Sequence, residues 1–377
     1  MKVVVAMDSF KGSLTSVEAG NAAGAGIKRV CDAEVVVKPM ADGGEGTTEA
    51  LVEGLGGEFV YVDVTGPMGE TVRAKYGILG DKTTAVMEMA AACGLTLIKR
   101  EDRNPWKATT YGMGEMILHA MERGCREFVI GIGGSATTEG GIGMLKALGY
   151  EFLDGRGQPV SEGVYGLEQI ASICGEHVPA ELKDCHFRIA CDVKNPLYGE
   201  NGAVYVFGPQ KGVRAEERQQ IDEKLIYFAK KTKEYTGVDN SMQEGAGAAG
   251  GLGFAFLSYL PHVELKSGID LVLDAVCLED ELKDADIVVT GEGCMDRQTA
   301  MGKVPVGVAH LAKRYNKKVI AFAGSVKENA GECNEEGIDA FFSIIRGAVT
   351  QEEAMLPENA KKNMELSVEQ VFRLLSL

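Results

Sequence analysis

The fold class of this chain is decided by residues 3–38, which read VVVAMDSFKGSLTSVEAGNAAGAGIKRVCDAEVVVK. The first five residues are apolar and mostly β-branched, as is typical of a buried parallel strand. Thr15 and Glu18 have the spacing of a capping box, which predicts a helix that begins there and ends near residue 30. A second β-branched run follows at 34–38. A strand, a helix and a strand at this spacing predict a right-handed βαβ unit in a parallel sheet.

The same alternation recurs at both ends of the chain. Beyond residue 38 the alternation predicts a helix at 47–55 and a strand at 59–64. Towards the C-terminus it predicts strands at 286–290, 318–323 and 340–345, a helix at 305–315 and a closing helix after 351. The middle is less regular, with predicted strands at 72–79, 85–89, 128–132, 188–191 and 204–207 and helices at 110–123 and 215–235. The strand at 128–132 is expected to lead through a glycine-rich turn into a helix ending at 148. These patterns alone leave open whether the two α/β ends form one domain.

Composition excludes several classes of protein. Of 377 residues, 55 are acidic and 39 are Lys or Arg, and the net charge of −16 argues against binding to nucleic acid. No apolar run approaches the roughly 18 residues of a membrane span, and the N-terminal run is too short for a signal peptide. The nine cysteines include no C-x-x-C, so reduced thiols in the cytoplasm are expected. The 49 glycines have no G-x-y period and accompany only 10 prolines, which excludes a fibre or a low-complexity chain.

The glycines are concentrated in short segments. Sixteen of the 49 lie within 43–46, 131–143, 245–253 and 291–293. Each segment follows a predicted strand or opens a predicted helix, where glycine permits positive φ and exposes backbone N–H groups that favour anions. These segments therefore predict phosphate binding through the backbone. For 245–253, tight packing of the helix is an equally good explanation.

The segment GIGGSA at 131–136 also satisfies the G-x-G-x-x-A dinucleotide pattern, with Glu151 about 20 residues further on. The hydroxyls of Ser135, Thr137 and Thr138 are not needed for hydride transfer. No Walker A sequence is present, because Gly302-Lys303 is followed by Val304, and no H-R-D or D-F-G set of the protein kinases occurs. An NAD-dependent oxidoreductase acting on a small hydroxy acid stays open as an alternative, and so does a ligand-binding sensor without turnover.

Carboxylates and lysines recur directly after predicted strands. Phosphoryl transfer requires Mg²⁺ held by carboxylates, cations on the phosphates and a group that positions the attacking hydroxyl. Ligands of α/β sheets bind at the carboxyl ends of the strands. The candidates at such places are Asp8 with Lys11, Asp42 with Glu45, Asp192, Lys211, and Glu292 with Asp296.

Taken together and in order, these motifs resemble the bacterial glycerate kinase family. The resemblance is carried by AMDSFKGSL at 6–14, ADGGEGT at 41–47, GIGGSAT at 131–137, ACDVKNPL at 190–197, FGPQKG at 207–212, GAGAAGG at 245–251, TGEGCMD at 290–296 and GKVP at 302–305. It implies ATP-dependent phosphorylation of D-glycerate to 2-phosphoglycerate. It also implies two α/β domains: a flavodoxin-like (Rossmann-like) parallel-sheet domain from residues 1–66 and 286–377, and an inserted second α/β domain with a mixed sheet from 67–285.

The resemblance and the chemistry together predict the roles of the site residues. Lys11 and Lys211 are expected to neutralise phosphate or the glycerate carboxylate, and Asp192 to accept or position the attacking hydroxyl. Asp42 and Glu45 are expected to bind Mg²⁺ or orient substrate, and Asp296 to complete the metal site with Glu292. The predicted nucleotide contacts are Gly131, Gly133, Gly134, Ser135, Thr137, Gly291, Glu292 and Gly293.

The expected ligands are ATP, Mg²⁺ and D-glycerate, and the expected assembly is a monomer or homodimer without nucleic acid or membrane. Three positions depart from the usual pattern of the family: Met7 stands where proline is usual, Thr138-Glu139 where Asn-Asp is usual, and Cys294 where arginine is usual.

Overall fold

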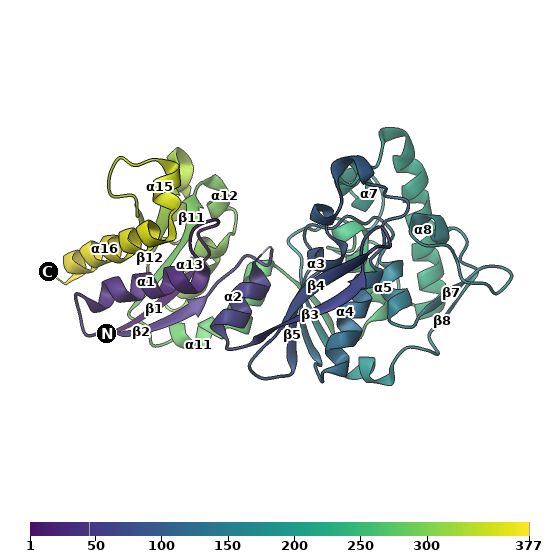
Figure 1. The fold of residues 1–377 in the computed structure, drawn as a ribbon, viewed down its shortest axis with the longest axis horizontal. Helices are drawn as coiled ribbons and strands as arrows, with labels where there is room; N and C mark the ends of the chain where they lie inside the picture. The colour runs from purple at the N-terminus through teal and green to yellow at the C-terminus, as the bar shows by residue number, and fades with distance from the viewer. Residues whose placement is uncertain (45, 377) are drawn as a thin grey trace. The chain divides into compact units, whose positions relative to one another are not determined.

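The computed structural model describes residues 1–44 and 46–376 and divides the chain into two compact units (Figure 1). Unit 1 consists of Met1–Gly56 and Ile269–Leu377, and unit 2 of Gly57–Gly268. Both units are α/β, which confirms the predicted fold class. In the described part of the chain, no helix combines the length and apolar character needed to cross a bilayer.

Unit 1 is built on a sheet of five parallel strands. In spatial order these are β13 (Ala340–Ser343), β12 (Lys318–Val326), β11 (Ile287–Met295), β1 (Lys2–Met7) and β2 (Glu34–Pro39). The chain order runs one way from β1 to β2 and the other way from β11 to β13. The order therefore reverses between β1 and β11, which is the place where open α/β sheets bind ligands.

Helices cover the sheet of unit 1. Helix α1 (Ser16–Lys28) begins at the predicted capping box, in which Thr15 accepts from Glu18 N and the Glu18 carboxylate accepts from Thr15 N. It packs against α16 (Pro357–Leu375), and a Cβ on Gly26 would lie 2.4 Å from the carbonyl oxygen of Glu365. Helix α13 (Val304–Arg314) packs on β11 and β12. The remaining helices of unit 1 are α2 (Thr47–Gly54), α11 (Leu278–Leu282), α12 (Arg297–Ala300), α14 (Glu332–Glu335) and α15 (Gln351–Met355).

Unit 2 contains a six-stranded mixed sheet. Its order is β10 (Val263–Lys266), β9 (His186–Ala190), β6 (Glu127–Gly131), β5 (Thr84–Glu88), β4 (Thr71–Ile78) and β3 (Glu58–Thr65). Strands β5, β6, β9 and β10 are parallel, whereas β3, β4 and β5 pair in antiparallel fashion. A separate hairpin joins β7 (Glu151–Leu153) to β8 (Ser172–Cys174).

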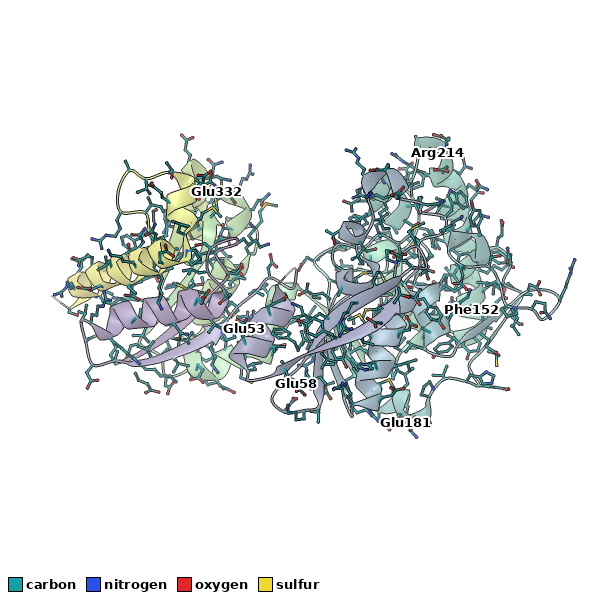
Figure 2. The ribbon with its side chains drawn as sticks, viewed as in Figure 1. Glu53, Glu58, Phe152, Glu181, Arg214 and Glu332 are labelled. Carbon is teal, nitrogen blue, oxygen red and sulfur yellow. The ribbon has the colours of Figure 1, made fainter. Side chains whose placement is uncertain are left out.

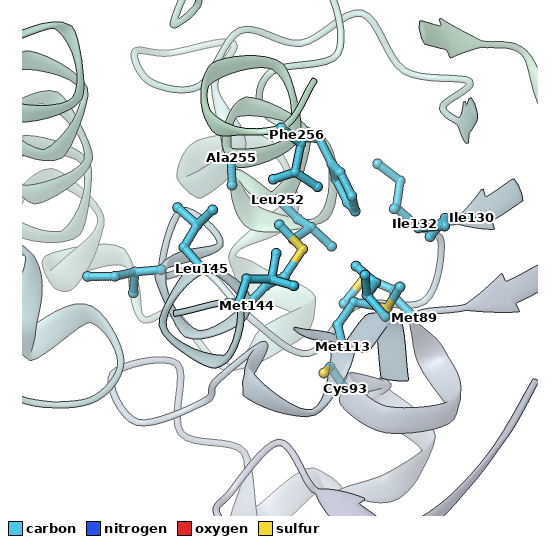
Figure 3. Packing of buried hydrophobic residues seen from close by; sticks show 14 of the residues in the cluster. Met89, Cys93, Met113, Ile130, Ile132, Met144, Leu145, Leu252, Ala255 and Phe256 are labelled. Atoms are coloured by element: carbon cyan, nitrogen blue, oxygen red, sulfur yellow. The ribbon is translucent and has the colours of Figure 1, made fainter. Parts of the chain in front are cut away.

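The helices of unit 2 enclose a core that is rich in sulfur-containing side chains. They are α3 (Ala90–Cys93), α4 (Tyr111–Glu122), α5 (Ile142–Ala147), α6 (Val164–Leu167), α7 (Ala203–Phe207), α8 (Arg218–Thr236) and α9 (Leu252–Tyr259). Helix α10 (Gly268–Ala275) begins at the last residue of unit 2 and, from Ile269 onward, belongs to unit 1 together with the helices named above. Met89, Met113 and Met144 are fully buried and belong to one apolar cluster with Leu252 and Phe256 (Figure 3). Charged side chains such as Glu53 and Glu332 in unit 1 and Glu181 in unit 2 are exposed at the surface (Figure 2).

The structure corrects several sequence predictions. Strand β3, which the sequence placed in the domain of 1–66, lies in unit 2 because it pairs along its whole length with β4. Residues 269–285, expected in the inserted domain, belong to unit 1. The run at 204–207 is not a strand but part of α7, where Gly208 ends the helix with a contact that only glycine allows: its Cβ would lie 2.2 Å from the Val204 carbonyl oxygen.

One further correction affects a glycine-rich segment. Strand β11 continues to Met295, so Gly291 and Gly293 lie within a strand paired to β12 and not in a loop after it. The strand predicted at 128–132 and the helix predicted to end at 148 are confirmed as β6 and α5, and the glycine-rich turn between them is long because α5 begins only at Ile142.

Candidate functional site

Three carboxylates gather at the carboxyl edge of the unit 1 sheet. Asp8 follows β1 directly, and its backbone N–H donates to the carbonyl of Gly291 in β11 at 2.9 Å. Asp42 follows β2, and Glu292 lies in β11. The side chain of Glu292 is buried, accepts a hydrogen bond from Thr299 Oγ1 at 2.5 Å and lies 4.0 Å from Lys303 Nζ.

Burial makes two of these carboxylates, Asp8 and Glu292, hard to ionise. Burial and the charge of nearby Asp42 together raise the pKa of Asp8 to about 6. Burial also raises the pKa of Glu292 to about 7, with a smaller contribution from Asp8. A bound cation would reverse both shifts, because an opposite charge favours the ionised form. The electrostatics of this edge therefore suit a cation that arrives with a ligand.

The carboxylates line a cavity of about 690 Å³ in unit 1, a size typical of small-molecule sites. Lys11 lines the same cavity and is exposed. Gly293 lies against the loop that carries this lysine, since a Cβ there would sit 3.5 Å from Lys11 N. The structure thus brings together the predicted residues Lys11, Asp42, Glu292 and Gly293.

The donor set of this edge fits Mg²⁺ carried by a nucleotide. Among residues 1–44 and 46–376, no group of three His, Cys, Asp or Glu side chains is close enough to hold a metal ion alone. Mg²⁺ in phosphoryl-transfer sites is usually bound by one or two carboxylates together with substrate phosphates and water. Asp8, Asp42 and Glu292 supply carboxylates of that kind.

Two other residues, Glu45 and Asp296, are also predicted for the metal site. Glu45 falls outside the described residues. Asp296 is the N-cap of α12, where its Oδ1 accepts from Gln298 N at 2.9 Å and its Oδ2 pairs with Lys327 Nζ at 2.9 Å. These contacts show that Asp296 caps α12 and pairs with Lys327. Asp8 is among the candidate carboxylates that follow a predicted strand, without a predicted role, and its carboxyl group is more deeply buried than that of Asp296.

In unit 2, Lys211 is only 2% exposed. Its Nζ donates to Ser135 Oγ at 3.0 Å and to the carbonyl oxygen of Thr137 at 2.6 Å. Burial lowers the pKa of Lys211 to about 7, and no carboxylate of the described residues forms an ion pair with it. Burying a cation without a negative partner raises the free energy of the folded protein. Binding of an anion beside this ammonium would offset that cost.

The loop beside Lys211 exposes backbone donors. Gly131 ends β6, and its carbonyl accepts from Met89 N at 2.8 Å. Gly133 and Gly134 follow and are exposed, and within the described chain neither N–H donates a hydrogen bond. A Cβ on Gly133 would meet nothing within 4 Å, while Gly134 has φ of +71°. Two free N–H groups next to a buried ammonium form an arrangement that suits an oxyanion.

The glycines at 245–253 pack against this loop. A Cβ on Gly250, which has φ of +72°, would lie 1.9 Å from the carbonyl oxygen of Thr137. A Cβ on Gly251 would lie 2.7 Å from the Cα of Gly140. Of the two explanations that the sequence left open, the structure supports close backbone packing, which holds the loop of Lys211 in place.

Glu139 was not predicted as a site residue, although the sequence marked it as a departure from the family pattern. It is fully buried, and its Oε1 accepts from Thr110 Oγ1 at 2.5 Å and from Thr110 N at 3.2 Å. Its Oε2 accepts from Gly143 N at 3.0 Å, and Thr110 Oγ1 accepts from Met144 N at 2.8 Å. Burial raises the pKa of Glu139 to about 8. One carboxyl group thus joins the N-termini of α4 and α5.

Asp192 follows β9 and is exposed. Its Oδ1 accepts from the backbone N–H of Gly268 at 2.9 Å, where α10 begins. This contact fixes the end of the β9 strand relative to the start of that helix. The predicted role of Asp192 toward the attacking hydroxyl stays a prediction.

The geometry does not match a dinucleotide fingerprint. That motif needs a helix that opens directly after the glycine turn and an acidic residue at the end of the next strand of the same sheet. Here α5 begins only at Ile142, and Glu151 lies in β7, which belongs to the separate hairpin. The hydride-transfer alternative therefore loses the feature on which it rested.

Comparison with known proteins identifies the family of the chain. A sequence model described as the glycerate kinase family matches residues 3–376. The chain is 49% identical over 346 residues to a glycerate kinase of Haemophilus influenzae, covering 92% of this chain and 91% of that protein. It is 46% identical over 355 residues to a glycerate 2-kinase of Escherichia coli, covering 94% and 93%. A crystal structure from Salmonella typhimurium LT2, described as "putative glycerate kinase 2", superposes with a TM-score of 0.91 at 45% identity and covers 100% of this chain and 98% of that one.

Proposed function

The chain belongs to the glycerate kinase family, and from this premise we propose that it transfers the γ-phosphoryl group of MgATP to the C2 hydroxyl of D-glycerate. The products are 2-phosphoglycerate and ADP. The structural observation that supports this proposal most is Lys211, a buried ammonium that has no acidic partner among the described residues and lies beside the open N–H groups of Gly133 and Gly134. Such a site attracts phosphate or carboxylate in a chain whose net charge is −16.

In the proposed reaction the C2 oxygen of glycerate forms a bond to the γ-phosphorus, and the bond from that phosphorus to the β–γ bridging oxygen breaks. The proton of the hydroxyl passes to a carboxylate, for which Asp192 is the candidate. Phosphoryl transfer depends mostly on positioning and charge stabilisation, so no strongly basic group is required. We assign Lys211 and Lys11 to the negative charges of phosphate or substrate carboxylate.

The proposed phosphate contacts come from two glycine-rich segments. In unit 2 they are Gly131, Gly133, Gly134, Ser135 and Thr137, of which Ser135 already bonds to Lys211. In unit 1 they are Gly291 and Gly293, which lie on either side of Glu292 in β11. At Gly133, where a Cβ would meet nothing within 4 Å, glycine leaves the backbone open to a phosphate.

Mg²⁺ would be held by one or two of the carboxylates Asp8, Asp42 and Glu292 together with phosphate oxygens, with Glu45 and Asp296 as the further positions that the sequence suggested. When bound, it would neutralise charge on the β- and γ-phosphates. The raised pKa values of Asp8 and Glu292 support this assignment, since both groups gain from a nearby cation.

A cytoplasmic location and a monomeric or homodimeric state complete the proposal. All nine cysteines are free, as expected of a reducing compartment.

The activity is tested by incubating the protein with MgATP and, separately, D-glycerate, L-glycerate, tartronate and glycerol, with the products identified by phosphorus NMR. We expect 2-phosphoglycerate from D-glycerate. A 3-phosphoglycerate signal would overturn the assigned position, and no product from D-glycerate would overturn the activity. ADP release without a change at the nicotinamide absorbance band separates this reaction from hydride transfer, and tight binding of both substrates without turnover would indicate a sensor.

A further inference from the structure

The cavity of unit 1 has an apolar end that the phosphoryl chemistry does not use. At one end it is lined by Asp8, Glu292 and Lys303. The other end is lined by the side chains that follow β13 and by those on α15, namely Ile344, Ile345, Val349, Ala354 and Met355. Val349 is 51% exposed, so its side chain is accessible to a ligand in this cavity.

We propose that this apolar end binds the adenine base of the nucleotide, with the phosphates directed toward the carboxylates and lysines of the same cavity. The proposal rests on the proposed function for the chemical class of the ligand. It assigns a base-binding role to residues 344–355, which carry none of the motifs that point to the family.

The size of the cavity favours a nucleotide over glycerate. The cavity measures about 690 Å³, and its lining runs from the carboxylates through Gly324 and Ser325 of β12 to Ile344, Ile345 and α15. A volume of this size accommodates a ligand of nucleotide size, whereas a three-carbon acid would fill only a small part of it.

The charges of the carboxylates in this cavity also favour a nucleotide over glycerate. The carboxylate of glycerate would face Asp8, Asp42 and Glu292, which repel it, and it has no flat apolar surface to place against Ile345 or Val349. Adenine is flat and largely apolar on its faces, and a triphosphate brings Mg²⁺, which the carboxylates attract. Gln351 and Ser325 line the same cavity and offer hydrogen-bonding groups to the edge of a base.

Glycines keep this cavity open. A Cβ on Gly324 would lie 2.6 Å from the Gly293 carbonyl oxygen, so no larger residue fits there without displacing β11. Gly12, at φ of +77°, lies against α15, where a Cβ would meet Met355 Cε at 3.0 Å. The loop after β1, which carries Lys11, is therefore in contact with the helix that carries the apolar wall.

The test compares two Val→Asp substitutions of matched exposure. Val349→Asp places a charge on the proposed base-binding wall, and Val238→Asp, at 54% exposure in unit 2, introduces the same charge away from it. Binding of ADP and of inorganic tripolyphosphate, each with Mg²⁺, is measured by calorimetry for both variants and the unmodified protein. Steady-state kinetics give KM for ATP and for D-glycerate.

We expect Val349→Asp to weaken ADP binding and raise KM for ATP at least tenfold, while tripolyphosphate binding and KM for D-glycerate change less than twofold. Val238→Asp should leave all four values unchanged. Equal ADP affinities in the two variants, or a change confined to D-glycerate, would overturn the base-binding assignment. Failure of the proposed function would give another result. In that case the unmodified protein would bind ADP but would not produce ADP when incubated with ATP and D-glycerate.

A second variant tests whether the loss of ADP binding in Val349→Asp comes only from the introduced charge. Ala354→Phe narrows the apolar end without a new charge, and its near-ultraviolet circular dichroism reports whether the fold is kept. It should also weaken ADP binding at least tenfold. Unchanged ADP binding by a folded Ala354→Phe variant would contradict the proposal.

Discussion

The Nζ atom of Lys211 lies 3.0 Å from the Oγ of Ser135, although the two residues are 76 positions apart in the sequence. Ser135 belongs to the glycine-rich segment after β6, and Lys211 to a short 3₁₀ turn (Pro209–Lys211). This hydrogen bond joins two motifs that are separate in the sequence, and together they form the anion-binding site that we propose.

Replacing Lys211 by methionine should lower kcat/KM by about two to three orders of magnitude, as expected for the loss of one preorganised charge. The fold should persist, because the substitution removes a buried cation and keeps the apolar stem. Activity assays and thermal unfolding check the two effects. Near-normal turnover in Lys211→Met would contradict the role given to this residue.

The same lysine predicts how stability depends on pH. Burial lowers the pKa of Lys211 from 10.5 to about 7, so between these values the unfolded chain binds more protons than the folded one. The contribution of Lys211 to the free energy of unfolding therefore rises from pH 7 to pH 10 and is absent below pH 7. Urea unfolding at several pH values should show this rise in the unmodified protein, and a smaller one in Lys211→Met. Identical slopes for both proteins would rule out the lowered pKa.

The raised pKa of Glu292 predicts how the reaction rate falls at acidic pH. Burial raises its pKa to about 7, and the hydrogen bond from Thr299 opposes that rise. If ionised Glu292 helps hold Mg²⁺, kcat/KM should fall as the pH drops below 7. Thr299→Val removes the hydrogen bond and should move this fall to higher pH. Thr71→Val, at an exposed position of β4, is the control and should leave the profile where it is.

Asp8→Asn should weaken activation by Mg²⁺. The substitution removes one of the carboxylates proposed to hold the ion but keeps a side chain of the same shape. Titration of activity with MgCl₂ at fixed ATP should show an apparent affinity for Mg²⁺ that is at least about tenfold lower. This change corresponds to a loss of about 1.4 kcal/mol in binding free energy. Asp63→Asn, at an exposed aspartate of β3, is the matched control. An unchanged titration would remove Asp8 from the proposed metal site.

Glu139→Ala should reduce the free energy of unfolding by about 3 kcal/mol or more, because it leaves the donors of Thr110 and Gly143 unpaired inside the protein. Glu139→Gln keeps one acceptor oxygen and should cost less. The control is Glu181→Ala at an exposed glutamate, which should change stability by no more than about 0.5 kcal/mol. Urea unfolding measures all three. Equal losses for Glu139→Ala and Glu181→Ala would contradict the helix-joining role.

Gly250→Ala and Gly237→Ala separate packing from backbone strain. Both glycines have positive φ, at +72° and +79°, but only Gly250 is in close contact, with the Thr137 carbonyl. Gly237→Ala should cost about 1–2 kcal/mol from the left-handed conformation alone. Gly250→Ala should cost clearly more and should also reduce activity, because it displaces the loop that Lys211 contacts. Similar stability and full activity in both variants would show that the close contact is unimportant.

Local patterns in the sequence determined the secondary structure and the class of fold. The β-branched runs at 3–7 and 34–38 and the capping box of Thr15 predicted β1, α1 and β2 within two residues of their observed ends. These signals suffice because strand and helix periodicity and helix capping depend on neighbours in the chain. The ordered motifs likewise identified the family without reference to the structure.

Only the tertiary structure decided which elements meet. Strand β3 has the pattern of a strand in either unit, and its pairing with β4 placed it in unit 2. The run at 203–207 is β-branched and aromatic, yet packing of Ala203 and Val204 makes it a helix. Burial of Lys211, Asp8, Glu139 and Glu292 has no local signal, because charged residues are ordinarily exposed. Their shifted pKa values arise from desolvation by segments distant in the sequence, so the chemistry of the site depends on contacts that no single stretch of this chain encodes.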